Sequence, residues 1–316
     1  MYPHPPSYAN GERVSEVGLV LVYHGVFRDV PAELAGAVHN VTPRSLGRQL
    51  DWLNSHFKIV PLDAMFDGCS PRGKVAITFD DGYKSVFTEA APLLFRRGIP
   101  FTVFINGGIL KKGIFWRDKI RWLINSQRVE SFLSFRAQLW PGEPEISGAN
   151  FYRGSKTPEV NSRILDGQID DYIGAQGLGA EVKKLSRFVA GEEDLIDHPL
   201  VTYGNHTLNH YVLSSLPVVE QATEIAGNDD VLQHLGLPCS AIFAIPFGDA
   251  RDTPRGLATY LRSQGYNGML FSRNRFNVGD QLPFACERFM PSDGWTDFHR
   301  NMLRIHWKCR RSPTSD

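Results

Sequence analysis

Two short segments carry the side chains whose types and spacing would support hydrolytic chemistry. The first is Thr78-Phe79-Asp80-Asp81-Gly82-Tyr83, in which two adjacent carboxylates follow an apolar, strand-like run. Successive side chains of a strand point in opposite directions, but the chain turns at a strand end, so both carboxylates can face one cleft. In α/β folds the chemistry lies at the carboxyl ends of the strands. An aspartate that caps a helix beside a turn aspartate gives the same pattern, so this segment alone leaves both interpretations open.

The second segment is His206-Thr207-Leu208-Asn209-His210, which follows another strand-like run. Two histidines four residues apart lie on one face of a helix or helical turn and suit a single metal ion. In zinc proteases of the HExxH type a glutamate follows the first histidine and acts as the base, but Thr207 stands there in this chain. An isolated HxxxH pair arises by chance. Together with the two aspartates, however, it predicts a metal site of two histidines and one carboxylate, with the other carboxylate as the base.

The elements around these segments follow the pattern of a parallel α/β fold, in which short apolar runs alternate with helix-period stretches. The helix that follows Thr42-Pro43 has a threonine N-cap and a proline in its first turn. Two further helices are expected over residues 85–97 and 217–235, each stopped by a glycine. The expected strands cover residues 18–24, 74–80, 101–105, 201–204 and 241–245.

The alternation is lost between residues 111 and 197, where an amphipathic helix beginning near Trp116 leads into a polar stretch with several Gly and Pro residues. This predicts one domain over residues 1–316 with a helical insertion near the carboxyl rim of the sheet. The insertion would be a lid, a wall of the substrate site or a plain structural elaboration.

Composition excludes several classes of protein. Lys and Arg together number 34, as do Asp and Glu, so the chain lacks the excess positive charge of a nucleic-acid-binding or polybasic membrane-surface protein. No apolar run approaches the roughly 20 residues that span a bilayer. No signal peptide is visible, which predicts a cytoplasmic protein, or an extracytoplasmic one if a leader has been removed. The four cysteines, Cys69, Cys239, Cys286 and Cys309, form no CxxC pair and indicate neither a disulfide framework nor a cysteine zinc site.

The two segments resemble the first two motifs of the polysaccharide deacetylases, the NodB-homology carbohydrate esterases. Residues 243–248 (FAIPFG) resemble the third motif, and residues 21–26 (LVYHGV) resemble the Tyr-His strand that opens many members. The resemblance implies an α/β fold, a distorted (β/α) barrel that usually has seven strands, with one divalent metal ion. The ion would be zinc by ligand type, although cobalt, nickel or iron would suit the same ligands.

The resemblance also implies a role for each matching residue. Asp81, His206 and His210 would bind the metal, and Asp80 would be the general base. The backbone N–H of Tyr83 would bind the oxyanion. Pro246 and Phe247 of the third motif would lie against the substrate.

Two departures from the family pattern affect these roles, and one further role has two candidate residues. Ala244 stands where many members have the arginine that pairs with the base, and Arg288 would substitute for it. The family's fourth motif is an aspartate and tryptophan pair near the C-terminus, and Asp293-Gly294-Trp295 resembles it only weakly. The general acid that protonates the leaving amine would be either His24 or His306, and the position of His24 at a strand end favours it.

Three functions are compatible with these residues. The first is metal-dependent removal of the N-acetyl group from an amino sugar in a glycan or glycolipid. The second is hydrolysis of a small non-sugar amide by an amidohydrolase of the same fold, which would have a closed apolar pocket. An open groove edged by aromatic side chains such as Trp116, Trp122 and Tyr211 would instead favour the first function, with a glycan as substrate. The third is a barrel that binds glycan without catalysis, against which the presence of both aspartates and both histidines argues. The residues predict no oligomeric state.

Overall fold

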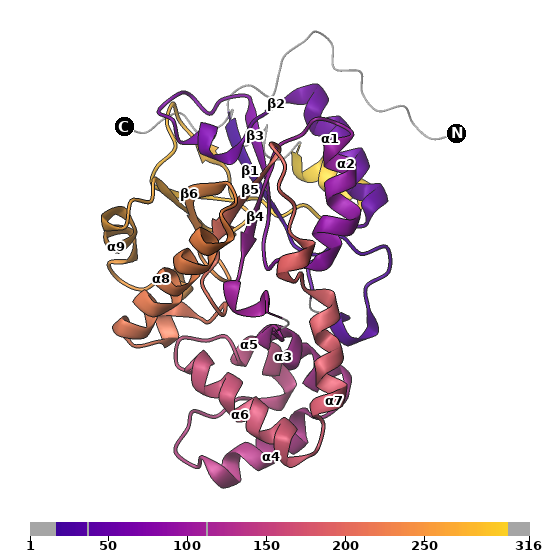
Figure 1. Ribbon diagram of the computed structural model, residues 1–316, viewed down its shortest axis with the longest axis vertical. Coiled ribbons are helices and arrows are strands. Elements are labelled where there is room, and N and C mark those ends of the chain that lie inside the picture. Colours follow the sequence, from indigo (N-terminus) through magenta and orange to yellow (C-terminus); the bar gives the residue numbers. More distant parts are fainter. Residues whose placement is uncertain (1–16, 37, 112, 303–316) are drawn as a thin grey trace.

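The computed structural model describes residues 17–36, 38–111 and 113–302 of the chain (Figure 1). Seven parallel strands form the wall of a distorted barrel, which confirms the predicted fold class. In spatial order they are β1 (Val17–Tyr23), β3 (Lys74–Phe79), β4 (Phe101–Ile105), β5 (Val201–Asn205), β6 (Cys239–Ala244), β7 (Gly268–Leu270) and β9 (Ala285–Cys286). Two short strands extend this wall: β2 (Lys58–Ile59) pairs with β3, and β8 (Asn277–Val278) pairs antiparallel with β1.

The chain that leaves β9 closes the barrel against the first strand. Phe289 forms a parallel bridge with Leu21 of β1. The Val22 N–H donates to the Phe289 carbonyl at 2.9 Å, and the Phe289 N–H donates to the Val20 carbonyl at 2.9 Å. This closure brings residues near 288 next to the carboxyl ends of β1 and β3, more than 200 positions earlier in the sequence.

The strands are buried on both faces, as expected for parallel strands covered by helices. Every residue of β1 and of β4 is buried. A small cluster drawn from alternate strand residues, including Val20, Ala76, Phe104 and Leu270, fills the inside of the barrel. The larger cluster packs the outer faces of the strands against the helices.

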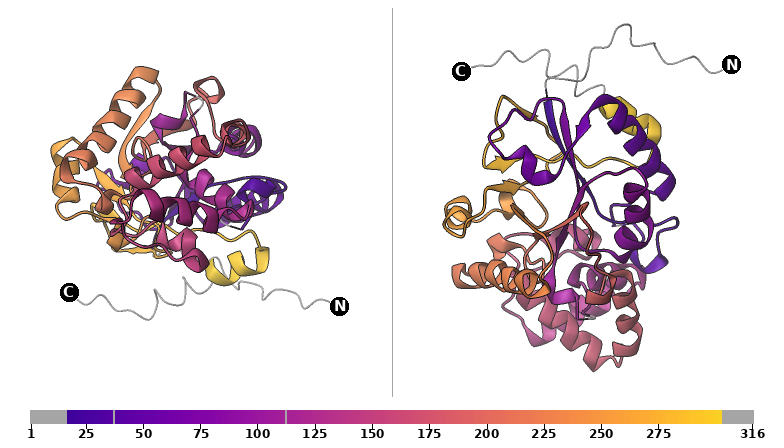
Figure 2. Two further views of the ribbon diagram at one scale, coloured as in Figure 1. Left: turned by 90° about the horizontal axis from the view of Figure 1, so that it is seen from below. Right: turned by 45° about the horizontal axis from the view of Figure 1, so that its top comes forward.

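The helices that cover the barrel begin and end close to the predicted positions. α1 (Pro43–His56) is capped by the Thr42 hydroxyl, which accepts from the Ser45 N–H, and α8 (Val218–Leu235) ends at Gly236 in the left-handed region. The helix predicted over residues 85–97 is a π-helical turn (Val86–Ala90) followed by α2 (Ala91–Phe95). Figures 1 and 2 show α1 and α2 on one side of the barrel and α8 and α9 (Leu257–Ser263) on the other.

The range 111–197 is filled mostly by helices that gather beyond one end of the barrel (Figure 1). We call the part from α3 to η7 the helical segment. It contains α3 (Trp116–Asn125), α4 (Val129–Leu139), α5 (Phe151–Gly154), α6 (Ser162–Ala175) and α7 (Gly179–Val182), followed by two 3₁₀ helices, η6 (Lys183–Phe188) and η7 (Glu192–Asp194). It begins just after β4 and returns to β5, so it lies at the carboxyl ends of the strands.

The helical segment is tied to the loop that follows β3. Near the end of the segment, the Ala190 N–H donates to the Gly82 carbonyl at 2.9 Å, beside an antiparallel bridge between Val189 and Tyr83. Near its start, Asp118 accepts a hydrogen bond from the Tyr83 hydroxyl at 3.0 Å. Among the described residues, no helix has both the length and the apolar character needed to cross a bilayer.

Candidate active site

The two aspartates of the first segment lie where β3 ends, and both are buried, with 2% of Asp80 and 3% of Asp81 exposed. Asp81 adopts a left-handed backbone conformation with φ 69°. This conformation turns the chain directly after Asp80, and both carboxylates line one pocket. The expected arrangement at the strand end is therefore present.

The histidine segment lies on the loop after β5, and the prediction of a helix or helical turn there is wrong. Local hydrogen bonds from side chains to the backbone replace the helical ones. The Asn205 side-chain oxygen accepts from the Thr207 N–H at 2.8 Å, and the Thr207 hydroxyl accepts from the His210 N–H at 3.0 Å. Thr207 and His210 both have positive φ, 64° and 59°. The spacing of four residues therefore brings the two imidazoles together through a looped backbone.

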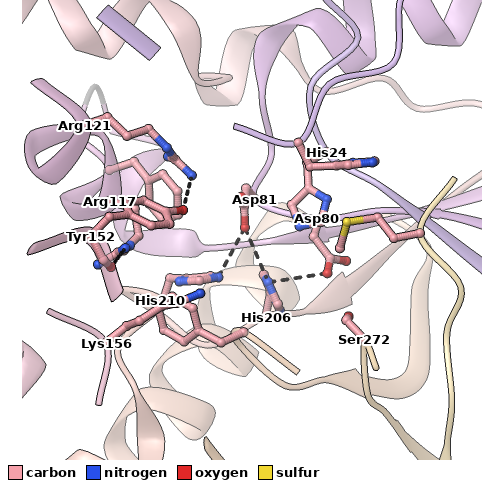
Figure 3. A pocket seen from close by; sticks show the side chains of 14 residues that line it. His24, Asp80, Asp81, Arg117, Arg121, Tyr152, Lys156, His206, His210 and Ser272 are labelled. Atoms are coloured by element: carbon pink, nitrogen blue, oxygen red, sulfur yellow. Dashed lines mark hydrogen bonds and ion pairs between the residues drawn. The ribbon is translucent and has the colours of Figure 1, made fainter. Parts of the chain in front are cut away.

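Asp81, His206 and His210 converge on one point, as Figure 3 shows. One candidate ligand atom from each lies within 4.8 Å of the other two. The Asp81 Oδ1 atom is 3.5 Å from Nε2 of His206 and 3.2 Å from Nε2 of His210. This buried oxygen has no hydrogen-bond partner in the described part of the chain. A buried carboxylate oxygen without a donor, facing two imidazole nitrogens, fits a divalent cation.

The hydrogen bond of His206 selects the nitrogen that would bind a metal. Its Nδ1 lies 2.8 Å from the carbonyl oxygen of Ala244, which can only accept, so Nδ1 carries a proton and Nε2, which faces Asp81, is the nitrogen that would bind a metal. Burial lowers the pKa of His210 to about 4, so this ring is neutral at neutral pH, as a metal ligand must be. Burial acts in the same direction on His206, but Asp80 and Asp81 outweigh it and raise the pKa of this ring, so a cation that binds there would displace a proton. The donor set suits a catalytic metal ion with open coordination positions.

Asp80 is held by Arg288, the substitute that the sequence suggested for the missing arginine of the third motif. The guanidinium donates to both carboxylate oxygens, at 2.7 and 2.6 Å, and Arg288 is fully buried. Burial opposes ionisation of Asp80, but Arg288 and then His206 outweigh it and lower the pKa of this carboxyl. Arg288 also donates to the Ser272 hydroxyl and to the Phe271 carbonyl, which fixes the plane of its guanidinium.

Substituting Arg288 with methionine should leave the Asp80 carboxylate buried without its ion-pair partner. Breaking such a pair costs about 3–5 kcal/mol of folding free energy, measured by denaturant unfolding at neutral pH. The ion pair stabilises the folded protein above the unfolded pKa of Asp80, and this stabilisation is lost as the pH falls through the lowered pKa of the folded state. The difference in free energy of unfolding between the wild type and Arg288→Met should therefore become smaller in acid. The acid limb of the rate profile should move to higher pH, because the pKa of Asp80 is no longer lowered.

Arg273→Met is the matched control for this prediction, because Arg273 pairs with Glu287 on the same side of the barrel and remains partly exposed. It should change neither the acid limb nor the stability by a comparable amount. An Arg288→Met protein with unchanged stability and an unchanged pH profile would show that the pair does not tune Asp80.

The third motif contributes a backbone carbonyl and an aromatic ring to the site. Phe247 has φ 64°, and its ring centroid lies 4.7 Å from that of His210. Gly248 follows with φ 67°, and a Cβ there would meet the backbone nitrogen of Ser272 at 2.5 Å, so only glycine fits. Of six non-glycine residues with positive φ in the described ranges, three line this pocket: Asp81, His210 and Phe247. Such clustering of strained conformations is typical of functional sites.

His24 lies at the end of β1 and lines the same pocket, next to His39 with ring centroids 5.5 Å apart. Its Nδ1 is buried and has no hydrogen-bond partner among the described residues, so it is not a core histidine bonded to the backbone. Burial lowers the pKa of His24, an effect that Asp81 and Asp80 partly oppose. The competing candidate, His306, lies outside the described residues.

Several residues singled out from the sequence lie elsewhere. The Asp293 carboxylate accepts from the Thr42 N–H and hydroxyl, and Trp295 stacks on His299, so this pair supports the start of α1 and does not line the pocket. Trp116, Trp122 and Tyr211 are all buried, so they do not form the open aromatic edge that would favour a glycan. Trp116 instead donates to the His210 carbonyl and supports the loop. Tyr83 and Pro246 are also absent from the pocket-lining side chains.

Four residues of the helical segment line the pocket and could not be selected from the sequence. Arg117 and Arg121 come from α3, Tyr152 from α5, and Lys156 from the turn after α5 (Figure 3). They belong to the polar range 111–197, where no motif or regular spacing distinguishes them. The only sequence signal was the suggestion that this range forms a wall of the substrate site.

The fold and the site together define a (β/α)-barrel hydrolase with paired carboxylates and histidines at the carboxyl rim. The profile of the family described as polysaccharide deacetylase matches residues 67–130, which contain β3 and both aspartates. No match was found among curated protein sequences. The resemblance is thus confirmed over residues 67–130, and the fold is of the NodB type.

Solved structures of deacetylases share this fold over most of the chain. The Streptococcus pyogenes deacetylase PplD in complex with acetate is 15% identical with a TM-score of 0.56, covering 92% of this chain and 99% of that one. IcaB from Ammonifex degensii is 18% identical with a TM-score of 0.52, covering 92% and 97%. A de-N-acetylase from Aggregatibacter actinomycetemcomitans is 15% identical with a TM-score of 0.51, covering 91% and 100%. At these identities the likeness establishes the fold.

Proposed function

We propose that the protein hydrolyses the N-acetyl group of an amino sugar in a glycan or glycolipid, with a divalent ion bound by Asp81, His206 and His210. The observation that carries this proposal is the convergence of these three side chains beside the Asp80–Arg288 pair at the carboxyl rim. Zinc is the ion proposed from the two imidazoles and one carboxylate, with cobalt, nickel or iron as substitutes.

Asp80 is positioned to act as the general base. A bound divalent ion would supply a Lewis acid for the amide carbonyl and would lower the pKa of a water molecule. Asp80 stays ionised because Arg288 lowers its pKa, and its Oδ2 lies 3.7 Å from Nε2 of His206, beside the proposed ligands. A carboxylate held there can remove the proton of the attacking water.

The remaining roles fall to the backbone and to His24. We assign the Tyr83 N–H to the oxyanion, because Gly82 and Tyr83 follow the aspartates directly and the helical segment holds this loop in place. Phe247 packs beside His210 and would contact the sugar, with Pro246 fixing the turn before it. His24 lies in the same pocket, and its protonated form would give a proton to the leaving amine, which is a poor leaving group without it. Because burial lowers the pKa of His24, this form is favoured below the ordinary pKa range of an imidazole.

Replacing His24 with alanine should keep the metal but lower turnover by about 10²–10⁴, the usual worth of a positioned proton donor. The fall in rate as the pH rises through the lowered pKa of His24, which reports the loss of the acid's proton, should be lost with it. Metal analysis and a pH–rate profile would measure both effects. The same measurements on His306→Ala provide the comparison. If His306→Ala has the lower turnover while His24→Ala behaves like the wild type, the general acid is His306.

The decisive experiment measures acetate release from an oligomer of N-acetylglucosamine, with metal content determined on the same sample. Activity that is lost on chelation and restored by zinc would support the proposal, whereas full activity without metal would refute it. The pocket bears on the alternatives, because most of its lining side chains are charged or polar, unlike the closed apolar pocket expected for a small amide. Glycan binding without acetate release would instead indicate a non-catalytic barrel.

A further inference from the structure

One wall of the pocket is built by cationic side chains of the helical segment. Figure 3 shows Arg117, Tyr152 and Lys156 on one side of the proposed metal ligands, and His24 and Asp80 on the other. The mechanism described above uses none of these three residues, so their position beside the reacting centre needs another explanation.

Arg117 is a buried cation that forms no ion pair with any residue in the described ranges. Only 1% of the residue is exposed, yet no carboxylate lies within ion-pair distance among the residues that the structure describes. Its two terminal nitrogens donate to neutral oxygens, the Ser155 hydroxyl at 2.8 Å and the Tyr152 carbonyl at 3.0 Å, and its Nε has no partner. A buried charge with only neutral partners is costly, so the arrangement favours an anion supplied from outside the chain.

Lys156 is a second cation beside the first. Its ammonium nitrogen lies 5.4 Å from the ring centroids of both Tyr152 and Phe247, and it has no ion pair in the described ranges. The guanidinium of Arg117 lies 4.5 Å and 5.5 Å from the same two rings. Since Phe247 also packs against His210, a single aromatic ring separates the two cations from a proposed metal ligand.

The neighbouring charges leave this wall with an excess of positive charge. Arg121 is neutralised by Asp118, to which it donates at 2.5 Å. The nearby carboxyl of Asp252 accepts from the Asp249 N–H and makes no ion pair with Lys156. Burial raises the pKa of Tyr152, but Arg121, Arg117 and Lys156 outweigh it and lower this pKa to about 8, as a positive local potential requires.

We propose that the substrate carries an oxyanion, either a carboxylate or a phosphate, next to the N-acetylated sugar, and that Lys156 and Arg117 bind it. This inference rests on the proposed function and narrows its substrate to anionic glycans or sugar phosphates. The guanidinium and the ammonium match the acceptors of both groups. Lys156 is only partly buried, so it can reach a ligand that enters from solvent.

The test compares three probes with the zinc-loaded, full-length protein at constant ionic strength, because exposed charge effects are screened by salt. The neutral probe is the disaccharide of N-acetylglucosamine. The other two are the disaccharide of glucuronic acid and N-acetylglucosamine, and N-acetylglucosamine 1-phosphate. Binding is measured by calorimetry, and acetate release is followed in parallel.

The wild-type protein should bind one of the anionic probes about tenfold more tightly than the neutral one, the usual worth of a charge-assisted hydrogen bond. Lys156→Met, which keeps the aliphatic packing on the two rings, should remove most of this preference and leave the neutral probe unaffected. Arg153→Ala removes an exposed cation from α5 and should preserve the preference. The anionic probe that is preferred identifies the group as a carboxylate or a phosphate.

Equal affinity of the wild type for all three probes would overturn the inference, as would an equal effect of Arg153→Ala and Lys156→Met. In either case, acetate release from the neutral disaccharide would leave the proposed function standing. Failure of the zinc-loaded wild type to release acetate from any probe would count against the proposed function, while the binding preference would still decide the present inference.

Discussion

Replacing His206 with alanine is expected to remove the bound divalent ion and to reduce acetate release to background. The imidazole is 1% exposed, with Nδ1 on the Ala244 carbonyl and Nε2 toward Asp81, so its removal takes away one of the three proposed ligand atoms. A site reduced to one imidazole and one carboxylate lacks the three protein ligands of a catalytic zinc site. Metal content by mass spectrometry and acetate release on the same sample measure the two losses.

His234→Ala provides the matched control, because His234 is an exposed histidine in the last turn of α8, outside the pocket. It should retain both metal and activity. Thermal unfolding of both variants separates loss of the ion from loss of the fold. A His206→Ala protein that binds a full equivalent of metal and turns over normally would rule out the proposed ligand set.

Asp80→Asn is expected to retain the metal and to lose on the order of 10²–10⁴ in turnover. The asparagine oxygen can still accept from Arg288, so the buried contact is kept in part, but the amide cannot remove a proton at neutral pH. Acetate-release kinetics and metal analysis measure the expected separation between binding and catalysis.

Asp81→Asn is the comparison for this variant, because Asp81 supplies the oxygen that faces both imidazoles. It should weaken metal binding, whereas Asp80→Asn should not. If Asp80→Asn lost its metal and unfolded, Asp80 would be a ligand or a structural anchor, and the base would have to be sought elsewhere in the pocket.

Much of the fold was predictable because the longer strands, such as β1, β3 and β4, are almost entirely buried and therefore read as apolar runs. The bounds predicted for β4 agree with the structure, and the other predicted strands differ by one or two residues. The barrel closure was not predictable, because Phe289 pairs with Leu21 through a single bridge that has no strand pattern of its own. The pairing of Leu21 with Phe289 depends on how the whole barrel packs, and the local pattern of apolar residues around either position does not reveal it.

The site was predictable where one short segment contains the chemistry, as with the aspartates and the histidine pair. The conformation of the histidine loop was not, because Asn205 and Thr207 replace helical hydrogen bonds by their own side-chain bonds. The role of Arg288 could only be suggested, since its contact with Asp80 spans 208 positions. Lys156 stands in a stretch without regular spacing, and only the folded segment brings it beside Phe247.

The attachment of the helical segment to the loop after β3 also affects how such enzymes can be redesigned. Tyr83 is held by Asp118 near the start of the segment, and Gly82 by Ala190 near its end. Transplanting another relative's segment would leave the Tyr83 hydroxyl and the Gly82 carbonyl without partners unless both attachments were carried over. A change of substrate range made through this segment would therefore also disturb the loop that carries both aspartates.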